Sequence, residues 1–191
     1  MPFSFEPATL SGVVVIETRL FRDDRGYFTE TYKQSDFIKA GITDPFVQDN
    51  FSYSSQGILR GLHYQKAPRA QAKLVSVARG EIFDVAVDIR QTSPTFGQWF
   101  GLRLSGENGR LLYIPAGFAH GFCVLSNEAC VNYKVNAEYD PSVDRGIIWN
   151  DPDLGIAWPI RSPLLSPKDA ALPRLCDADN NFVFSRRSSE S

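Results

Sequence analysis

The stretch from Ile58 to Ile89, ILRGLHYQKAPRAQAKLVSVARGEIFDVAVDI, decides the fold. Apolar residues alternate with polar ones over residues 59–65, 73–77 and 83–89, which is typical of β-strands with one buried face. The pair Arg79-Gly80 separates the last two segments and reads as a turn. The stretch therefore predicts three antiparallel strands.

Within this stretch, Arg60, His63 and Lys73 carry polar heads among apolar neighbours. Strict alternation would put Arg60 and His63 on opposite faces of the sheet. Gly61 lies between them, however, and a Gly inside a strand often marks a bulge that redirects the side chains beside it. We expect both to face one cavity. Lys73 shares a face with two valines, and a buried ammonium group needs an anion. The chemistry is therefore expected here.

Length and composition indicate one domain over residues 1–191, with residues 184–191 as a disordered tail. The content of 14 Phe, 7 Tyr and 3 Trp against one Met favours sheet over a helix bundle. A net charge of −2 argues against a general binder of nucleic acid or of membrane surfaces. Any anion must be bound locally.

The three cysteines, Cys123, Cys130 and Cys176, are odd in number and show no CxxC spacing. Neither a disulfide framework nor a zinc site is indicated, and reduced thiols fit a cytoplasmic protein. No segment reaches the roughly 18 apolar residues of a membrane span. The N-terminus lacks a basic region followed by an apolar one, so no export signal is expected.

The rest of the chain reads as short strands between turns. One short helix is expected over Ser35–Ala40, with Ser35 as its cap and Gly41 as its stop. Strands are expected over 12–18, 27–32, 46–53 and 99–104, with turns at 21–26 and 106–110 and a loop at 92–97. Residues 111–115 lead into 119–122, residues 129–135 have one apolar face, and residues 146–152 close the sheet region. This pattern predicts an all-β sandwich or barrel, with the segment beyond residue 159 folding back over it.

Several polar residues allow two interpretations at this stage. Gln48 and Asn50 share one face of a strand, which suits ligand binding but also an exposed sheet face. Arg25 and Glu30 flank a turn and strand, where solvated charges are the ordinary explanation. Tyr133 lies between two valines on an apolar face and is either a structural tyrosine or a functional phenol.

The number of histidines limits the possible chemistry. With two His and no HxH pair, the sequence argues against a metal site. No Ser or Cys lies in a G-x-S-x-G motif, which argues against a nucleophilic enzyme. Acid/base chemistry remains. A lone His on a sheet is more often a hydrogen-bonded core residue, but His63 has Arg60 and Lys73 as neighbours in the same predicted hairpin.

Seven motifs between about residues 10 and 184 resemble those of one enzyme family: RGLHYQ (60–65), AQAKLV (70–75), GEIFDVAVD (80–88), IPAGFAHGF (114–122), WNDP (149–152), LSPKD (165–169) and DNNFV (179–183). Together they are similar to the dTDP-4-dehydrorhamnose 3,5-epimerases. The resemblance implies a cupin-type double-stranded β-helix, or jelly roll, with few short helices, no metal and no cofactor. It also implies a homodimer, and the net charge already argues against nucleic acid or membranes as partners.

The resemblance further implies a reaction and a site. The substrate would be dTDP-4-dehydro-6-deoxy-D-glucose, inverted at C3 and C5 through an enolate to give dTDP-4-dehydro-L-rhamnose. His63 matches the family's base, Tyr133 its acid, and Asp169 the carboxylate that orients the base. Tyr139 matches the aromatic residue that stacks on thymine. The remaining substrate-contacting positions are Arg25, Glu30, Gln48, Asn50, Arg60, Lys73, His120, Asp144 and Lys168.

Two residues depart from the family pattern. Asp144 stands where members often carry Glu, and Phe51 where many carry His; both bear on substrate preference rather than on the chemistry. Three other readings stay open: a single-position epimerase of a related deoxysugar, a sugar-nucleotide binding module without catalysis, and a metal-dependent cupin oxygenase. The second would lack the set of His63, Tyr133 and Asp169, and the third is disfavoured by the histidine count.

Overall fold

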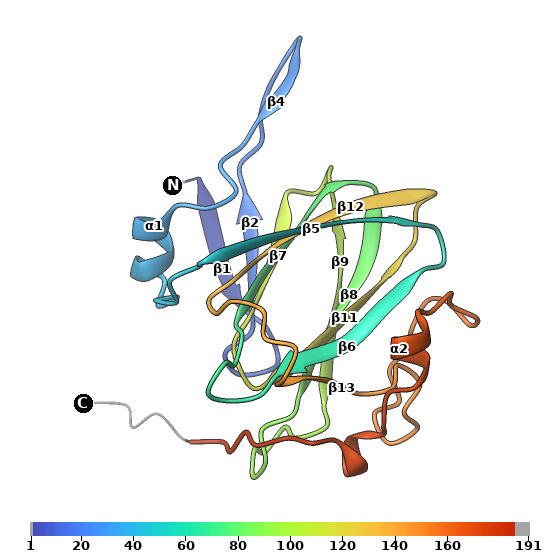
Figure 1. Cartoon of the computed structure of the whole chain (residues 1–191). Coiled ribbons are helices and arrows are strands. Elements are labelled where there is room, and N and C mark those ends of the chain that lie inside the picture. Colours follow the sequence, from blue (N-terminus) through green and yellow to red (C-terminus); the bar gives the residue numbers. More distant parts are fainter. Residues whose placement is uncertain (1, 186–191) are drawn as a thin grey trace.

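Two antiparallel β-sheets face each other in the computed structural model, which describes residues 2–185 (Figure 1). The first sheet contains, in spatial order, β1 (Phe3–Pro7), β2 (Val14–Thr18), β10 (Arg110–Ile114), β7 (Lys73–Arg79), β12 (Glu128–Val135) and β5 (Gln48–Ser55). The second contains β13 (Asp144–Gly146), β6 (Leu59–Gln65), β11 (Phe118–Val124), β8 (Glu81–Asp88) and β9 (Trp99–Ser105). Neighbouring strands are mostly distant in sequence. The predicted jelly roll is confirmed.

The three strands of the central stretch form where the alternation predicted them, but they do not pair with one another. β6 pairs with β11 and β13, whereas β7 lies in the facing sheet between β10 and β12. The predicted hairpin of β6 and β7 is therefore wrong. The loop between these strands crosses from one sheet to the other, so His63 and Lys73 approach each other across the interior.

Alternation on β8 explains how one strand serves both sides of its sheet. Val85 and Val87 pack outward in a cluster with residues of the C-terminal segment. Ala86 packs inward with residues of both sheets, and Asp84 on the same face is fully buried. Because side chains alternate along a strand, the face of β8 that carries Ala86 also places the carboxylate of Asp84 in the interior.

A second apolar cluster lies on the outer side of the first sheet, beneath helix α1 (Gln34–Lys39). Phe37 of α1 is 1% exposed and packs edge-on against Phe3 and Phe5. The predicted cap is wrong, because Ser35 lies inside the helix and Lys33 occupies the cap position without a side-chain bond. Gly41 has a φ of 85° and ends the helix as predicted.

Two further helical turns were missed by the sequence reading, α2 (Pro167–Ala170) and the 3₁₀ turn Leu175–Asp177. Ser166 caps α2: its Oγ accepts a hydrogen bond from the backbone N–H of Asp169, 3.1 Å away. Pro at the first helical position has its φ already set for a helix. This short turn holds Asp169 at a fixed place beside β6.

A two-stranded arm, β3 (Phe21–Asp23) and β4 (Gly26–Phe28), projects away from the sheets (Figure 1). The predicted turn at 21–26 is therefore mostly strand, and the predicted strand at 27–32 ends at Phe28. Three aromatic residues of the arm, Phe21, Tyr27 and Phe28, are between 42% and 67% exposed. Such exposure is unusual for large apolar side chains unless another surface covers them.

The C-terminal segment wraps along the outside of the second sheet (Figure 1). It is ordered further than predicted, since the backbone N–H of Phe184 donates to the carbonyl oxygen of Gln91 at 2.8 Å. Residues 186–191 of the predicted disordered tail lie outside the described residues. Within the part of the chain that the structure describes, no helix is long and apolar enough to cross a membrane.

Candidate active site

A cavity of about 290 Å³ lies between the two sheets and is closed on one side by α2. It brings together side chains from five strands and from the C-terminal segment. Its lining consists of Ser52, Arg60, His63, Lys73, His120, Phe122, Tyr133, Ser166, Lys168 and Asp169. Seven of the residues predicted for the site line this cavity, so the fold brings together residues that are distant in sequence.

His63 and Asp169 form a hydrogen-bonded pair, with 2.7 Å between Nε2 and Oδ1. Asp169 is 4% exposed. Burial alone would raise the pKa of this carboxyl, but the hydrogen bonds from His63, Gly61 and Ser166 outweigh it and lower the pKa. An ionised carboxylate only accepts hydrogen bonds. His63 therefore carries its hydrogen on Nε2, which leaves the lone pair on Nδ1 to take a proton.

Gly61 explains how both Arg60 and His63 reach the cavity. Its φ of 116° lies in the region that favours glycine, and a Cβ at this position would lie 2.7 Å from the carbonyl oxygen of His120. The ladder between β6 and β11 shifts register here. The predicted irregularity at Gly61 is confirmed, and only glycine lets the two strands approach so closely.

A second buried pair, His120 and Asp84, lies directly across the ladder from His63. His120 Nε2 and Asp84 Oδ1 are 2.8 Å apart, and the two side chains are 7% and 0% exposed. Burial lowers the pKa of His120 despite the attraction of Asp84. The sequence reading did not include Asp84 in the site. The sequence feature that indicates Asp84 is its position two residues before Ala86, on the inward face of β8.

Lys73 reaches the cavity from the opposite sheet and is 8% exposed. Its Nζ donates to the backbone carbonyl of His63 at 3.3 Å. Burial lowers the pKa of Lys73 from 10.5 to about 8, although Asp144 and Asp84 attract its charge. Within residues 2–185 no carboxylate lies within ion-pair distance of it. The anion that this ammonium group needs is therefore left to a ligand.

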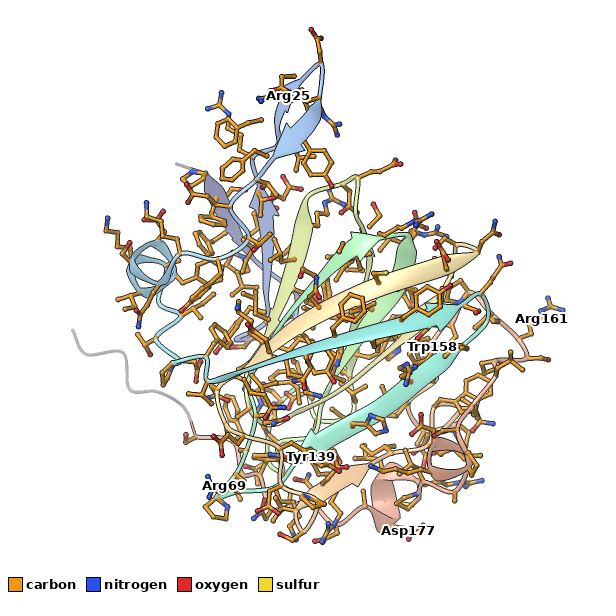
Figure 2. All side chains as sticks on the ribbon, turned by 45° about the horizontal axis from the view of Figure 1, so that its top comes forward. Arg25, Arg69, Tyr139, Trp158, Arg161 and Asp177 are labelled. Carbon is orange, nitrogen blue, oxygen red and sulfur yellow. The ribbon has the colours of Figure 1, made fainter. Side chains whose placement is uncertain are left out.

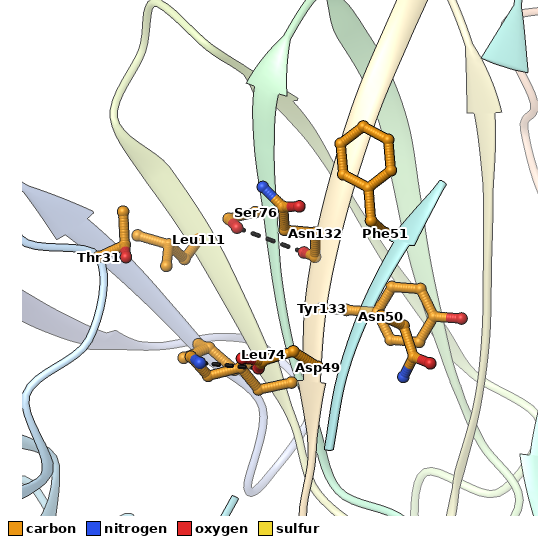
Figure 3. Close-up of a pocket in the computed structure, with 10 residues that line it drawn as sticks. Thr31, Asp49, Asn50, Phe51, Leu74, Ser76, Leu111, Asn132 and Tyr133 are labelled. Atoms are coloured by element: carbon orange, nitrogen blue, oxygen red, sulfur yellow. Dashed lines mark hydrogen bonds and ion pairs between the residues drawn. The ribbon is translucent and has the colours of Figure 1, made fainter. Parts of the chain in front are cut away.

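Tyr133 lies on β12, opposite Val75 on one side and Asn50 on the other. Its phenol lines the cavity, and burial raises the pKa of Tyr133, so the hydroxyl keeps its proton at neutral pH. Figure 3 shows this region around a neighbouring hollow on the first sheet, where Ser76 Oγ donates to the carbonyl of Asn132. A protonated phenol in the cavity can act as a general acid.

The rim of the site is held by hydrogen bonds between predicted ligand residues. Asp144 Oδ2 accepts from Lys168 Nζ at 2.5 Å and from the Tyr139 hydroxyl at 3.2 Å. Gln48 donates to Asn50 and accepts from the backbone N–H of Tyr139. Asp144 was predicted as a substrate contact, but this carboxylate is engaged in holding Lys168 and Tyr139.

Arg60 is anchored in a similar way. Its Nε donates to the buried Ser54 Oγ at 3.0 Å, and its Nη2 donates to the carbonyl of Tyr53 at 3.4 Å. A guanidinium has five N–H donors, so several remain for an anion at the mouth of the cavity. Ser54 was missed by the sequence reading. The sequence feature that indicates it is its place as the fourth polar residue on the inward face of β5, after Gln48, Asn50 and Ser52.

Two predicted substrate contacts, Arg25 and Glu30, do not line this cavity. Arg25 lies at the tip of the projecting arm, with a side chain 90% exposed and paired with Asp23. Figure 2 places it at the opposite end of the molecule from Tyr139. Neither residue meets the other predicted site residues within its own chain, and a substrate contact by Arg25 or Glu30 stays a prediction.

The chain is similar to proteins of one enzyme family. A family model described as dTDP-4-dehydrorhamnose 3,5-epimerase matches residues 7–177. The enzyme of that name from Shigella flexneri is 54% identical over 168 residues, covering 87% of this chain and 93% of its own length. A dTDP-4-dehydrorhamnose 3-epimerase from Streptomyces niveus is 40% identical, covering 90% of this chain and 84% of its own.

The solved structures that resemble this fold have related activities. The epimerase from Legionella pneumophila, determined in complex with dTDP-4-keto-L-rhamnose, superimposes with a TM-score of 0.88 at 50% identity, covering 91% of this chain and 93% of that one. Both the sequence match and the fold extend over nearly the whole chain. The chain belongs to the dTDP-4-dehydrorhamnose 3,5-epimerase family of isomerases.

Proposed function

We propose that His63, Tyr133 and Asp169 carry out the acid/base chemistry by which this enzyme inverts C3 and C5 of dTDP-4-dehydro-6-deoxy-D-glucose, giving dTDP-4-dehydro-L-rhamnose. The observation that carries the proposal is the 2.7 Å bond between His63 and Asp169, in one cavity with Lys73 and Tyr133. The ketone at C4 acidifies the hydrogens on both flanking carbons. One base can therefore serve both positions.

His63 removes the proton. Nδ1 of its neutral imidazole accepts the proton from C3 or C5. The resulting imidazolium is stabilised by the ionised Asp169 through the hydrogen bond at Nε2. A positioned base of this kind contributes roughly 10²- to 10⁴-fold to the rate. Asp169 also fixes the tautomer, because a carboxylate that accepts at Nε2 keeps Nδ1 unprotonated.

Lys73 stabilises the enolate. When the proton leaves carbon, negative charge develops on the C4 oxygen, and the buried ammonium group is an electrostatic partner for it. His120, bonded through Nε2 to Asp84, lines the same cavity, and the charge of Asp84 favours the ammonium form of Lys73. A pKa of about 8 keeps most of Lys73 charged at pH 7. The enolate oxygen is then the anionic partner that Lys73 lacks among the described residues.

Tyr133 delivers the proton that completes the inversion. It comes from the first sheet, whereas His63 comes from the second, so a sugar ring held between the sheets has the base on one face and the acid on the other. Inversion requires this arrangement. A phenol whose pKa is raised by burial stays protonated until it is used.

The nucleotide half of the substrate lies toward the rim. Arg60 binds the pyrophosphate with the donors that Ser54 leaves free, and a planar guanidinium matches phosphate oxygens well. Tyr139 stacks on thymine, and Lys168, Gln48 and Asn50 contribute hydrogen bonds. The fixed rim reduces the side-chain entropy lost on binding.

The active form is a homodimer in which the arm of one subunit completes the site of its partner. This accounts for Arg25 and Glu30, which match substrate-contacting positions but do not line the cavity of their own chain. Exposed aromatic residues on the arm, together with Phe51 and Tyr53 on the outer face of β5, are the surfaces that the dimer would bury.

A complementation experiment tests this dimer. The variants His63→Asn and Arg25→Ala are each expected to be inactive. Co-expressed and randomly assorted, half of the dimers are hybrids, and each hybrid has one site with both native residues. Activity should recover to roughly a quarter of the parent value. No recovery would mean that Arg25 acts in its own subunit or not at all.

The reaction itself is tested by proton NMR in deuterated water with the 4-keto sugar nucleotide. Deuterium at C3 and C5, with accumulation of the L-rhamno product, is expected. The Streptomyces niveus relative makes a single-position epimerase the second candidate, and exchange at only one carbon would favour it. No exchange at either carbon would indicate a binding module.

We also propose a cytoplasmic location and a single domain over the whole sequence. The location is supported by the nucleotide-sugar substrate and by the three free thiols. The domain is supported by the continuity of the inner cluster, which draws residues from both sheets.

A further inference from the structure

Ser52 presents a buried hydroxyl without a partner to the catalytic cavity. Its side chain points inward from β5, between Asn50 and Ser54, and lines the cavity with Arg60 and His63. Its Oγ is buried and has no hydrogen-bond partner among the described residues. A buried polar atom that is left unsatisfied destabilises a fold, so its presence in a binding cavity points to a ligand.

The position of Ser52 along β5 indicates which part of the ligand it meets. At one end of the strand, Gln48 accepts from the backbone of Tyr139. At the other end, Ser54 holds Arg60. Residues two apart on a strand are separated by roughly 7 Å, so Ser52 lies one such step from the anchor of Arg60 and two from Gln48.

This order follows the order of groups in a nucleoside diphosphate. If thymine lies at Tyr139 and the pyrophosphate at Arg60, the inward face of β5 runs from the base end to the phosphate end of the ligand. Ser52 is at the phosphate end. Its hydroxyl is a donor, and a bond from a hydroxyl to a charged phosphate oxygen is stronger than one between neutral groups.

We propose that Ser52 is a pyrophosphate-binding residue, whose hydroxyl donates to a phosphate oxygen next to those held by Arg60. This assignment rests on the proposed function for the identity of the ligand. It explains why a serine stays on the inward face of β5, opposite Val131, where an alanine would pack equally well. The hydroxyl is unsatisfied in the free protein and satisfied in the complex.

The proposal predicts two effects of the variant Ser52→Ala, one on the melting temperature and one on the affinity for dTDP. Removing an unpartnered hydroxyl leaves the melting temperature of the ligand-free protein unchanged or raises it. Removing a donor to a charged phosphate weakens the binding of dTDP by roughly 10- to 100-fold. Affinity falls without loss of stability.

Ser126→Ala is the matched control. Ser126 Oγ accepts from the backbone N–H of Glu81 at 2.8 Å and donates to the carbonyl of Glu128 at 2.6 Å, so its hydroxyl is fully engaged with the protein. It does not line the catalytic cavity. Its loss should lower the melting temperature and leave the affinity for dTDP unchanged, which is the reverse of the pattern expected for Ser52.

The experiment measures dTDP binding by calorimetry, and melting temperatures without ligand, for the parent and both variants. Affinity of Ser52→Ala within twofold of the parent would overturn the proposal. A fall in melting temperature like that of Ser126→Ala would also overturn it, by revealing a protein partner. Weaker binding of the sugar nucleotide with unchanged binding of dTDP would move the contact to the sugar. Isotope exchange by the parent tests the proposed function separately, because dTDP binding does not require turnover.

Discussion

Replacing Lys73 by Met is expected to stabilise the folded protein while abolishing its activity. Burial lowers the pKa of Lys73 from 10.5 to about 8, and one pKa unit corresponds to about 1.36 kcal/mol. At pH 7 both the folded and the unfolded chain hold the ammonium ion, so its burial costs the folded state about 3 kcal/mol. Met is of similar length, uncharged and able to fill irregular space. The free energy of unfolding should rise by about that amount.

The pH dependence of the free energy of unfolding distinguishes the cost of burying the Lys73 charge from a change in packing. The folded-state pKa lies below the unfolded one, so between pH 8 and 10.5 the unfolded chain binds more protons. The stability of the parent relative to Lys73→Met therefore increases through that window, and the difference closes by about pH 10.5. Urea unfolding of both proteins at pH 7 and pH 10 measures it, since all other titrating groups are common to the two chains.

Lys39→Met is the control, because Lys39 lies exposed at the end of α1 and its replacement should change stability by less than about 0.5 kcal/mol. A difference between parent and Lys73→Met that is the same at pH 7 and pH 10 would refute the argument from the buried charge. So would a variant that is less stable than the parent at pH 7.

Three further predictions concern the reaction. His63→Asn should abolish deuterium exchange at C3 and at C5, measured by NMR; exchange that persists at either carbon would require another base. Tyr133→Phe should let solvent deuterium enter with retained configuration while epimer formation falls roughly 10²- to 10⁴-fold; an epimerisation rate near that of the parent would make Tyr133 a packing residue. A chelator should leave activity unchanged, because residues 2–185 contain no group of three or more metal-ligating side chains; loss of activity that a divalent cation restores would contradict this.

Local patterns predicted the strands and their inward faces, but not which strands pair. The alternation in the central stretch depends on residues two apart, so it correctly placed His63 and Lys73 among inward-facing residues. Pairing depends on contacts between distant segments. β7 bonds to β10 and β12 rather than to β6, and nothing within residues 58–89 specifies this.

The same distinction holds for the site. Gly61 was informative because its effect on β6 is local. Asp84 and Asp144 act through His120 and Lys168, which lie 36 and 24 positions away in sequence, and their roles follow only from the folded structure. Asp169 was found by resemblance to a family rather than by any pattern around it. Ser52 needed the structure, because an unpartnered hydroxyl has no sequence signature.

The bond between His63 and Asp169 joins residues 106 positions apart in the chain. During synthesis from the N-terminus, β1 to β12 leave the ribosome before Asp169 does. A nascent chain can thus hold both sheets while its histidine still has no carboxylate to orient it. On the proposed mechanism, catalytic competence is acquired when the C-terminal segment docks, so the onset of activity would report the completion of the chain rather than the formation of its core.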